Sequence, residues 1–472
     1  MPRERLIDSI ILTEKILRVQ PNVKKIYLLI RAPDSNSAKH RFNNEDQQTS
    51  TTTISSQHIT LHVSVLKTDL FRVLREKLVA NLHSFIEDKV SLVPGDIACD
   101  SLDEMCREVD IIIRYCYKYQ CIGSMHVVEF SKQCSKLKML LHVSTAYVSG
   151  EKEGLILEKP LNYGETLNGS SVLDIQVEQR LVEEALKDLQ VRHATGKEVT
   201  LAMKVLGIER ARLHGWPNTY SFTKAMGEML LGHFKEDLRL IILRPTIILS
   251  TYKEPFPGWI EGMRTINTFI VGYRKGKQKV AIGGRDTIAD VIPVDMVVNS
   301  VIAAIVAHQN PSSHTVVYHI SSSRSKQLKL DDFIQIGIDY FKKNPWIDER
   351  GKPVKMKKFH LLDSMESLHK YIGIHYMPAL KILKWTNSIL CQHLQAQYAN
   401  LERRINDAIR LAELYRPYAF FKGVFDDTNA EMLRMAIRES NADDTLNFDP
   451  TTIQWEKYFK ETHIPGVVRY IF

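Results

Sequence analysis

The sequence predicts an α/β fold, in which helices cover a doubly wound parallel sheet, followed by a smaller, mostly helical domain. Short apolar runs alternate with segments of helical periodicity along the first part of the chain, as in strands joined by crossover helices. These runs are continuously apolar, which is typical of parallel strands buried on both faces. Beyond about Leu330 helical spacing dominates. We therefore expect one domain over residues 1–330 and a second over residues 331–472.

The predicted elements follow in order along the chain. A long, polar segment from Glu151 to His214 interrupts the alternation. The expected strands are Lys24–Ala32, Val90–Val93, Val109–Ile113, Met139–Val143, Leu238–Pro245, Lys279–Ile282 and Val316–Ile320. The expected helices are Ile10–Val19, Leu70–Phe85, Met125–Cys134, Gln176–Gln190, Val297–Val306 and Leu401–Tyr415. The sheet should therefore be built mainly before residue 321.

Polar side chains stand where several predicted strands end. Arg31, Asp96 and the pair Ser144-Thr145 all occupy such positions. Ligands of open parallel sheets bind outside the carboxyl ends of the strands. An arginine there suits a 2′-phosphate and indicates NADP rather than NAD, although Arg31 could equally be a solvent-exposed residue. Asp96 could contact an adenine or form a turn through its own side chain.

The most chemically suggestive motif is Tyr220-x-x-x-Lys224. Pro217 can open a helix and Asn218 can cap it, so a spacing of four places Tyr220 and Lys224 on one face. A nearby ammonium lowers the pKa of a phenol and makes it a better proton donor near neutral pH. The alternative is an ordinary amphipathic helix, because a chain with 18 tyrosines can contain such a pair by chance. The pair is therefore a candidate that needs support from the rest of the chain.

Composition narrows the class of protein. The net charge of +8 permits anionic ligands such as nucleotides, coenzyme A or a membrane surface, but requires none. No apolar stretch approaches the roughly 20 residues of a membrane-spanning helix. The first residues resemble neither a signal peptide nor a transit peptide. The six cysteines contain no C-x-x-C pair. We expect an intracellular protein with reduced thiols, no metal site and no nucleic-acid partner.

Several motifs together resemble those of an extended short-chain dehydrogenase. They are Leu28–Ala32, Pro94–Ile97, His142–Val148, Tyr220-x-x-x-Lys224 and Leu243–Pro245. More narrowly, Gly215–Glu228, Val291–Asn299 and Trp455–Gly466 are similar to segments of plant alcohol-forming fatty acyl-CoA reductases. The resemblance runs from about Ile10 to the C-terminus and includes the long insertion. A sugar- or steroid-type dehydrogenase of the same superfamily is the other reading, and the segment Trp455–Gly466 argues against it.

The resemblance implies NADPH-dependent reduction of a long or very long fatty acyl-CoA through an aldehyde to a primary alcohol, as in wax or suberin synthesis. It implies that Thr145 and Ser144 bind the substrate carbonyl oxygen and that Tyr220 protonates it. Lys224 would lower the Tyr220 pKa and hold the ribose hydroxyls. An acyl-CoA substrate also allows peripheral contact with a membrane, such as the cytosolic face of the endoplasmic reticulum. The implied cofactor contacts are Arg31, Asp96, Ile97, Lys224 and Pro245.

Two departures from the family pattern concern the cofactor. The family pattern opens with a strand and a Gly-rich loop, whereas this sequence joins it at the first helix and has no glycine before Gly95. Such a loop lets backbone N–H groups approach a pyrophosphate. The family's Asn-Ser-Ala-Ala loop is also replaced, by Arg114–Gln120. We therefore expect a Rossmann-like sheet without its first strand. These departures favour an alternative function, a catalytically impaired paralogue that binds acyl-CoA or a partner reductase.

Overall fold

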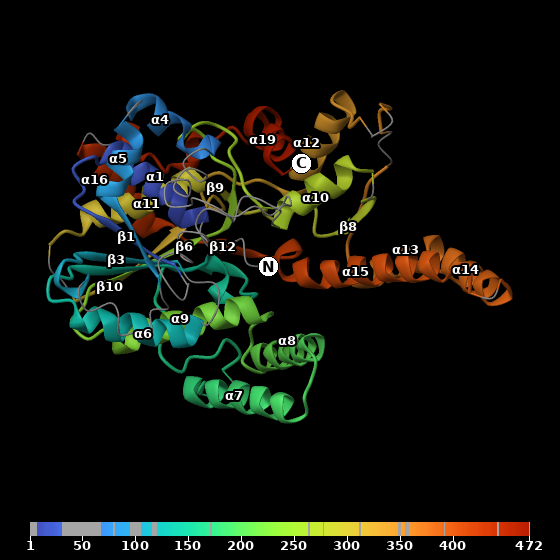
Figure 1. Cartoon of the computed structure of the whole chain (residues 1–472). Helices are drawn as coiled ribbons and strands as arrows, with labels where there is room; N and C mark the ends of the chain where they lie inside the picture. Colours follow the sequence, from blue (N-terminus) through green and yellow to red (C-terminus); the bar gives the residue numbers. More distant parts are fainter. Residues whose placement is uncertain are drawn as a thin grey trace, which may run out of the picture.

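A parallel sheet lies between two layers of helices, and a long pair of helices extends from this body (Figure 1). The apolar strands need cover on both faces, which is why helices pack above and below them. The computed structural model describes residues 7–30, 68–78, 81–94, 105–115, 120–169, 172–262, 265–276, 278–310, 313–347, 351–354, 358–390, 392–440 and 443–471.

The main sheet has four parallel strands in the order β10-β6-β4-β3. Alternate residues of β6 point to opposite sides, so Ile241 and Leu243 pack in one apolar cluster and Leu240 and Ile242 in another. This burial on both faces confirms the predicted parallel α/β arrangement. The strands are β3 (Ile111–Tyr115), β4 (Met139–Val143), β6 (Leu240–Pro245) and β10 (Thr315–Ile320).

Two further strands, β1 (Ile26–Ile30) and β2 (Val90–Pro94), form a separate parallel pair. In a doubly wound fold the strands are numbered along the chain and lie side by side in the order 3-2-1-4-5-6. In that numbering β1 corresponds to strand 2, β2 to strand 3 and β3 to strand 4. None of the described strands corresponds to strand 1, which would lie between β1 and β3. The Tyr27 hydroxyl nevertheless donates a hydrogen bond of 2.7 Å to Glu108, just before β3. These six strands, β1, β2, β3, β4, β6 and β10, therefore form two sheets rather than one continuous sheet.

Helices cover both faces of the main sheet (Figure 1). On one face α6 (Gln120–Gln133) packs beside α9 (Thr219–Phe234). On the other, α1 (Ile7–Val19) packs against α11 (Val294–Ala307), the buried helix expected around residues 297–306. The largest apolar cluster joins residues from α1, β4, β6, α11 and the C-terminal helices. The core of the molecule is thus on the α1 and α11 face.

The long segment before α9 forms a helical hairpin. Its first helix, α7 (Ile175–Val191), agrees with the predicted helix over 176–190. The second, α8 (Gly196–Leu213), was not expected. It begins at a capping box in which Thr195 and Glu198 satisfy each other's backbone N–H groups. This sequence signal was present and could have predicted the helix.

Two predicted boundaries near the N-terminus are wrong. The single helix expected over residues 70–85 is divided into η2 (Asp69–Phe71), α4 (Arg72–Leu78) and α5 (Leu82–Lys89). The residue before α5 is Asn81, a type that favours helix caps over helix interiors. The strand expected to end at Ile113 continues to Tyr115, because both added residues pair with β4.

The C-terminal part is mostly helical, as predicted. Its principal helices are α12 (Leu330–Lys343), α13 (Met365–His375), α14 (Met377–Ile389), α15 (Gln395–Ala419), α16 (Thr428–Glu439), α18 (Trp455–Tyr458) and α19 (Ile464–Tyr470), with a π-helical turn, Phe459–His463, before α19. The sequence predicts no strands after Leu330, and this prediction is wrong at two places. Strand β11 (His360–Leu362) pairs with β8 (Val280–Ile282), and β12 (Gly423–Phe425) pairs with β5 (Gly154–Ile156).

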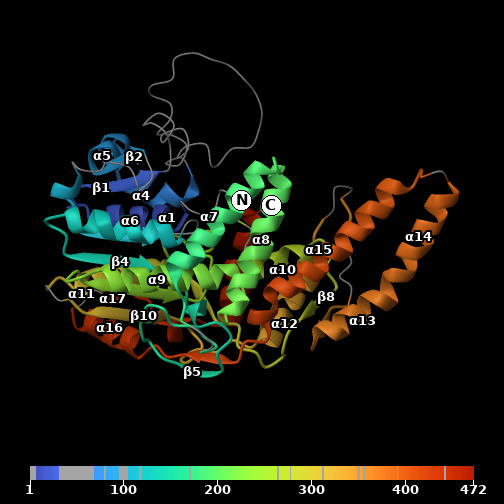
Figure 2. The ribbon, with the colours of Figure 1, turned by 90° about the horizontal axis from the view of Figure 1, so that it is seen from below.

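The C-terminal helices are of two kinds. Helices α16, α18 and α19 contribute to the main apolar cluster, whereas α13, α14 and α15 project outward (Figures 1 and 2). The short strands β7 (Ile247–Leu249) and β9 (Val291–Pro293) pair near the first group, together with α10 (Thr265–Arg274) and α17 (Asp443–Leu446). The domain boundary at residue 330 stays a prediction. Among the described helices, none combines the length and apolarity needed to cross a bilayer.

Candidate active site

The helix that carries the Tyr-Lys motif begins where the sequence predicts. Asn218 is its N-cap, and the Asn218 Oδ1 atom accepts a hydrogen bond of 2.9 Å from the backbone N–H of Ser221. Tyr220 therefore lies in the first turn of α9 and is half-buried. Lys224 lies one turn later on the same face. The local geometry expected for the motif is confirmed.

Lys224 reaches the carboxyl edge of the sheet. Its side chain is buried, with only 4% of its area exposed. The Lys224 Nζ atom donates a 3.1 Å hydrogen bond to the carbonyl oxygen of Val143, the last residue of β4. The ammonium group is therefore held beside the residue that precedes Ser144 and Thr145.

The two hydroxyl residues follow β4 directly. The Ser144 backbone N–H donates a 2.7 Å hydrogen bond to the carbonyl oxygen of Leu243, which fixes the strand end against β6. Ser144 is buried, and its hydroxyl has no hydrogen-bond partner among the described residues. A buried hydroxyl without a partner carries a desolvation cost, so it is a natural contact for a bound polar group. This orphan hydroxyl is the clearest sign of a ligand position at the sheet edge.

Thr145 connects the ends of β4 and β6. Its Oγ1 atom accepts a 3.4 Å hydrogen bond from the Tyr147 backbone N–H and lies 3.5 Å from the carbonyl oxygen of Pro245, to which it donates. Thr145 is also the N-cap of η6 (Ala146–Ser149), a short 3-10 helix. The structure thus brings together Ser144, Thr145, Lys224 and Pro245, with Tyr220 one helical turn from Lys224.

The remaining predicted cofactor contacts are not placed. Arg31, Asp96 and Ile97 lie outside the residues that the structure describes. Their assignment to the cofactor stays a prediction from the sequence. The described part of the candidate site lies at the carboxyl ends of β4 and β6.

A buried ion pair that the sequence analysis missed fixes α9 against the sheet. The Arg244 guanidinium, on β6, donates to Glu228 on α9, with its Nε atom 3.1 Å from each carboxylate oxygen. The Arg244 Nη2 atom donates to Glu228 as well, and the Nη1 atom donates a 3.0 Å hydrogen bond to the carbonyl oxygen of Lys159. Both charged side chains are buried. Glu228 follows Lys224 by four residues, and this spacing is the signal that could have identified it.

His142 lies beneath the site with positive groups around it. Burial, followed by the charges of Arg114, Lys224 and Arg244, holds the His142 pKa well below its usual value. The ring is therefore neutral, and its Nδ1 atom is 3.3 Å from the Arg114 Nη1 atom. Of these cations, Arg244 is offset by Glu228, whereas the charges of Arg114 and Lys224 favour negative charge at the strand end. This is the potential that a developing oxyanion requires.

The C-terminal part contacts the start of the motif helix. The Asn218 Nδ2 atom donates a 3.2 Å hydrogen bond to the Tyr418 hydroxyl at the end of α15. The Tyr418 ring also packs edge-on against Tyr147, with centroids 4.8 Å apart. Because 200 residues separate Asn218 and Tyr418, no local sequence pattern could have revealed this contact.

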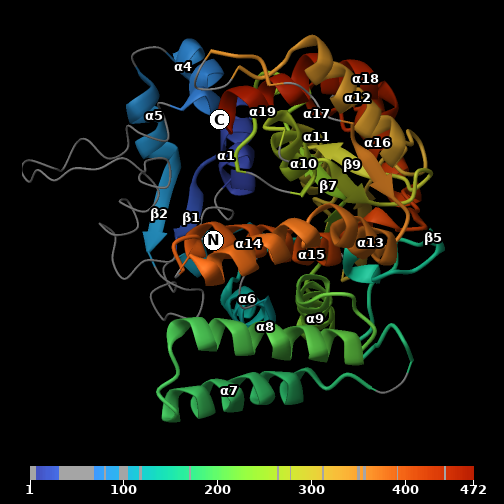
Figure 3. The same cartoon turned by 90° about the vertical axis from the view of Figure 1, so that its right-hand side faces the viewer.

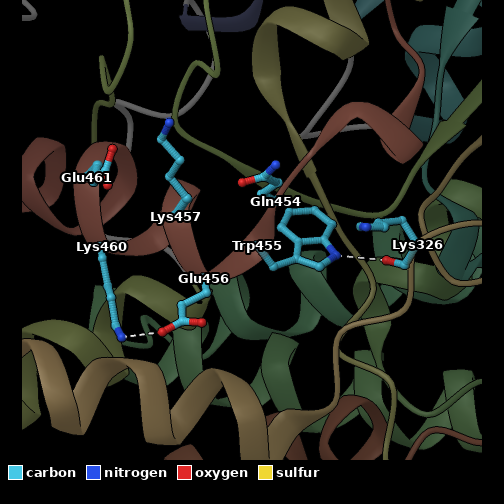
Figure 4. Close-up of a pocket in the computed structure, with 7 residues that line it drawn as sticks. All are labelled: Lys326, Gln454, Trp455, Glu456, Lys457, Lys460 and Glu461. Carbon is cyan, nitrogen blue, oxygen red and sulfur yellow. Dashed lines mark hydrogen bonds and ion pairs between the residues drawn. The ribbon is translucent and has the colours of Figure 1, made fainter.

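A separate cavity of about 460 Å³ lies on the C-terminal segment (Figure 4). Trp455 forms one wall, and its indole Nε1 atom donates a 2.8 Å hydrogen bond to the carbonyl oxygen of Lys326. No residue predicted for the active site lines this cavity. Its lining residues are Lys326, Gln454, Trp455, Glu456, Lys457, Lys460 and Glu461.

Comparison with known proteins decides the family. An NAD-binding family profile described as male sterility protein matches residues 10–301, and a second profile of that description matches residues 374–472. The chain is 45% identical over 483 residues to an alcohol-forming fatty acyl-CoA reductase of Simmondsia chinensis, with 98% of this chain and 94% of the relative covered. This chain belongs to the fatty acyl-CoA reductase family. The resemblance seen in the motifs is confirmed.

Other members of the fatty acyl-CoA reductase family match over the same length. Fatty acyl-CoA reductase 1 of Arabidopsis thaliana is 42% identical, with 98% of this chain and 94% of the relative covered. Among solved structures, the reductase domain of a nonribosomal peptide synthetase from Mycobacterium tuberculosis has a TM-score of 0.52 at 13% identity, covering 98% of this chain and 88% of that one. The terminal R domain of the myxalamid pathway has a TM-score of 0.53 at 14% identity, with 98% and 87% covered. These two likenesses show the fold.

Proposed function

We propose that this chain reduces a long or very long chain fatty acyl-CoA to a primary fatty alcohol, through a fatty aldehyde, with NADPH as the reductant. Membership of the reductase family supports the substrate class. The observation that carries the proposal is the orphan hydroxyl of Ser144, the residue that follows Val143, whose carbonyl oxygen accepts the Lys224 hydrogen bond at the carboxyl edge of the sheet. A role in wax, suberin or similar lipid synthesis is part of the proposal.

The proposed catalytic roles divide between the strand end and the helix. Ser144 donates a hydrogen bond to the oxygen of the thioester or aldehyde carbonyl. Thr145 donates a second one when its hydroxyl turns away from the Pro245 carbonyl that it contacts in this structure. Tyr220 delivers a proton to that oxygen as negative charge develops on it. Lys224 stabilises the phenolate that remains, because an adjacent ammonium favours the charged form of the phenol. The ion pair between Glu228 and Arg244 keeps α9 at the depth that these contacts need.

The described residues fit the nicotinamide half of the cofactor. A bound nicotinamide supplies the hydride. Lys224 would hold the ribose hydroxyls, and Pro245 would border the ring at the end of β6. Arg31 would select the 2′-phosphate of NADPH, and Asp96 with Ile97 would border the adenine. The NAD-binding profile that matches residues 10–301 supports a nicotinamide cofactor.

The test uses the purified full chain with a series of long and very long chain acyl-CoA thioesters and NADPH, with NADH in parallel. We expect fatty alcohol by gas chromatography, released coenzyme A, and faster turnover with NADPH. Absence of both aldehyde and alcohol with every thioester, in a preparation that binds NADPH, would contradict the proposed activity. Because the substrate carries a long acyl chain, we also propose that the protein makes a peripheral contact with a membrane.

One observation favours a second function, a catalytically impaired paralogue that binds acyl-CoA or a partner reductase. The place between β1 and β3, where the first strand of a doubly wound sheet leads into the pyrophosphate-binding turn, is not filled by any described strand. This second function predicts negligible NADPH binding. A fluorescence titration that gave a micromolar dissociation constant would exclude it, and retained acyl-CoA binding without NADPH binding would support it.

A further inference from the structure

We infer that the outward face of α14 docks onto the surface of an anionic lipid bilayer. This face carries three large apolar side chains that protrude into solvent, Ile382 at 65% exposure, Trp385 at 71% and Ile389 at 59%. Their spacing of three and four residues aligns them in one row along the helix. We call these three residues the α14 row. A row of this kind is an unpartnered apolar stripe where a solvent-exposed helix would normally carry polar residues.

The opposite face of α14 is already used. Leu380 and Asn387 are buried on it. The Asn387 amide donates a 2.8 Å hydrogen bond to Gln395, and its oxygen accepts one of 2.8 Å from the backbone N–H of Leu394. These bonds fasten α14 against the start of α15. Because α14 is held on that side, the α14 row cannot turn inward to bury itself.

Helices α13, α14 and α15 hold this row away from the body. Helices α13, α14 and α15 extend beyond the sheet, with the turn between α14 and α15 at the far end (Figures 1 and 2), and they lie in front of the body in Figure 3. Two further apolar residues near the two ends of α14 are also exposed, Ile374 on α13 and the C-cap residue Leu390. Helix α14 therefore lies at the outer edge of the molecule (Figures 1 and 2).

The charges beside the row select an anionic surface. Lys381 precedes Ile382 and Lys384 precedes Trp385 by one residue each, so both lysines line the same flank of the row. Helix α14 contains no acidic residue. Long lysine side chains can bury their methylene groups and keep the ammonium at the level of lipid headgroups. This arrangement, with tryptophan at the apolar boundary, is typical of a helix that lies in the membrane interface.

A bilayer surface fits these observations better than a spanning mode. No described helix could cross a membrane, so the contact would be peripheral. A single apolar row with a basic flank inserts only to a shallow depth in the bilayer. Anionic lipids then strengthen binding by about fivefold for each basic residue near the membrane surface. The inference concerns an attachment surface. It is independent of the proposed catalytic roles.

The first test is cosedimentation of the purified full chain with vesicles of phosphatidylcholine alone or with 30% phosphatidylserine. No acyl-CoA or NADPH is present, so the result does not depend on reductase activity. We expect binding to the anionic vesicles that falls about tenfold or more in the variant Ile382→Ser/Trp385→Ser/Ile389→Ser. The matched control is Met432→Ser/Met435→Ser on α16, which removes two residues of 55% and 53% exposure from the body and should bind as the wild type does.

Charge reversal separates the electrostatic contribution. Lys381→Glu/Lys384→Glu should lower binding to anionic vesicles by about tenfold or more, with a smaller effect at high salt. The control pair Lys136→Glu/Lys138→Glu makes the same change of net charge with two exposed lysines between α6 and β4. Equal losses in the two charge variants would overturn the assignment of the contact to α14.

Trp385 provides a direct readout. Three of the five tryptophans are buried and Trp346 is half-buried, whereas Trp385 is mostly exposed. Addition of anionic vesicles should shift the emission to shorter wavelength, and Trp385→Phe should abolish the shift while keeping most of the binding. Vesicle binding unchanged in the Ser variant of the α14 row would overturn the inference. The inference would also be overturned if the wild type is a dimer that does not bind vesicles and the Ser variant is a monomer. In that case the row joins two copies of the chain.

Discussion

Arg244 and Glu228 form a buried ion pair that ties helix α9 to the main sheet, with the Arg244 Nε atom 3.1 Å from both carboxylate oxygens. Each residue lies next to a predicted functional position. Glu228 is one turn beyond Lys224, and Arg244 precedes Pro245. The pair therefore sets how far α9 can move relative to the strand ends where the carbonyl would bind.

We expect Glu228→Ala to destabilise the protein strongly, because it leaves the Arg244 charge buried without its counterion. Breaking such a pair costs about 3–5 kcal/mol. Urea unfolding followed by circular dichroism measures the change. The control is Asp331→Ala, which breaks the exposed pair with Arg285 and should cost less than about 1 kcal/mol. Similar losses in the two variants would show that the buried pair has no special role.

Ser144→Ala should separate stability from activity. The Ser144 hydroxyl has no partner among the described residues, so its removal should change the free energy of unfolding by less than about 0.5 kcal/mol. If the hydroxyl binds the substrate oxygen, turnover should fall about 10²-fold. Thermal unfolding and the reductase assay on one preparation measure both effects. A large loss of stability would show that the hydroxyl has a structural partner instead.

The strands and the motif helix could be predicted because their signals are local. Continuous apolar runs located β4 and β6, and Asn218 marked the start of α9. The pairing of β5 with β12 could not be predicted, since each strand is three residues long and the two lie far apart in the sequence. The ion pair of Glu228 with Arg244 likewise depends on how α9 packs on β6. Local patterns therefore placed the candidate site residues better than they placed the residues that hold them in position.

The C-terminal helices show the same limit. Helical periodicity predicted a helix over residues 401–415, within α15. It did not predict that the end of α15 would reach Asn218, because this contact depends on how a distant hairpin packs. The α14 row also escaped the sequence analysis. Apolar residues at helical spacing normally indicate a face turned to the core, and only the structure shows that this face is exposed.

Asn218 should have two separable roles. Asn218→Ala removes the N-cap of α9 and should cost about 1 kcal/mol of stability. Asn218→Asp keeps an acceptor for the Ser221 backbone N–H but loses the amide that donates to Tyr418. We therefore expect the Asp variant to be as stable as the wild type and the two variants to differ in chemical denaturation. If the Ala variant is fully stable, the cap contributes nothing.

Glu158 should make stability depend on pH. It is buried, accepts hydrogen bonds from the backbone N–H groups of His319 and Asn429, and burial raises its pKa from 4.5 to about 7. The folded state therefore binds a proton more tightly than the unfolded chain. The stability that this proton provides is complete below about pH 4.5 and is lost as pH rises to about 7.

The measurement compares the free energy of unfolding of the wild type and Glu158→Gln between pH 4.5 and 8. The neighbours are Asp426, whose charge also raises the Glu158 pKa, and His319, whose buried ring has a pKa of about 3 and stays neutral. The wild type should lose on the order of 3 kcal/mol relative to the variant across this range. Parallel pH profiles would contradict the assigned pKa.

The central claim is that Tyr220 protonates the substrate oxygen with Lys224 beside it. The most direct test is the steady-state formation of fatty alcohol from a long-chain acyl-CoA and NADPH by the purified wild type and by Tyr220→Phe. We predict alcohol from the wild type and a turnover lower by about 10²–10⁴-fold in the variant, with the NADPH dissociation constant and the unfolding temperature almost unchanged. Turnover of Tyr220→Phe equal to that of the wild type would contradict the account.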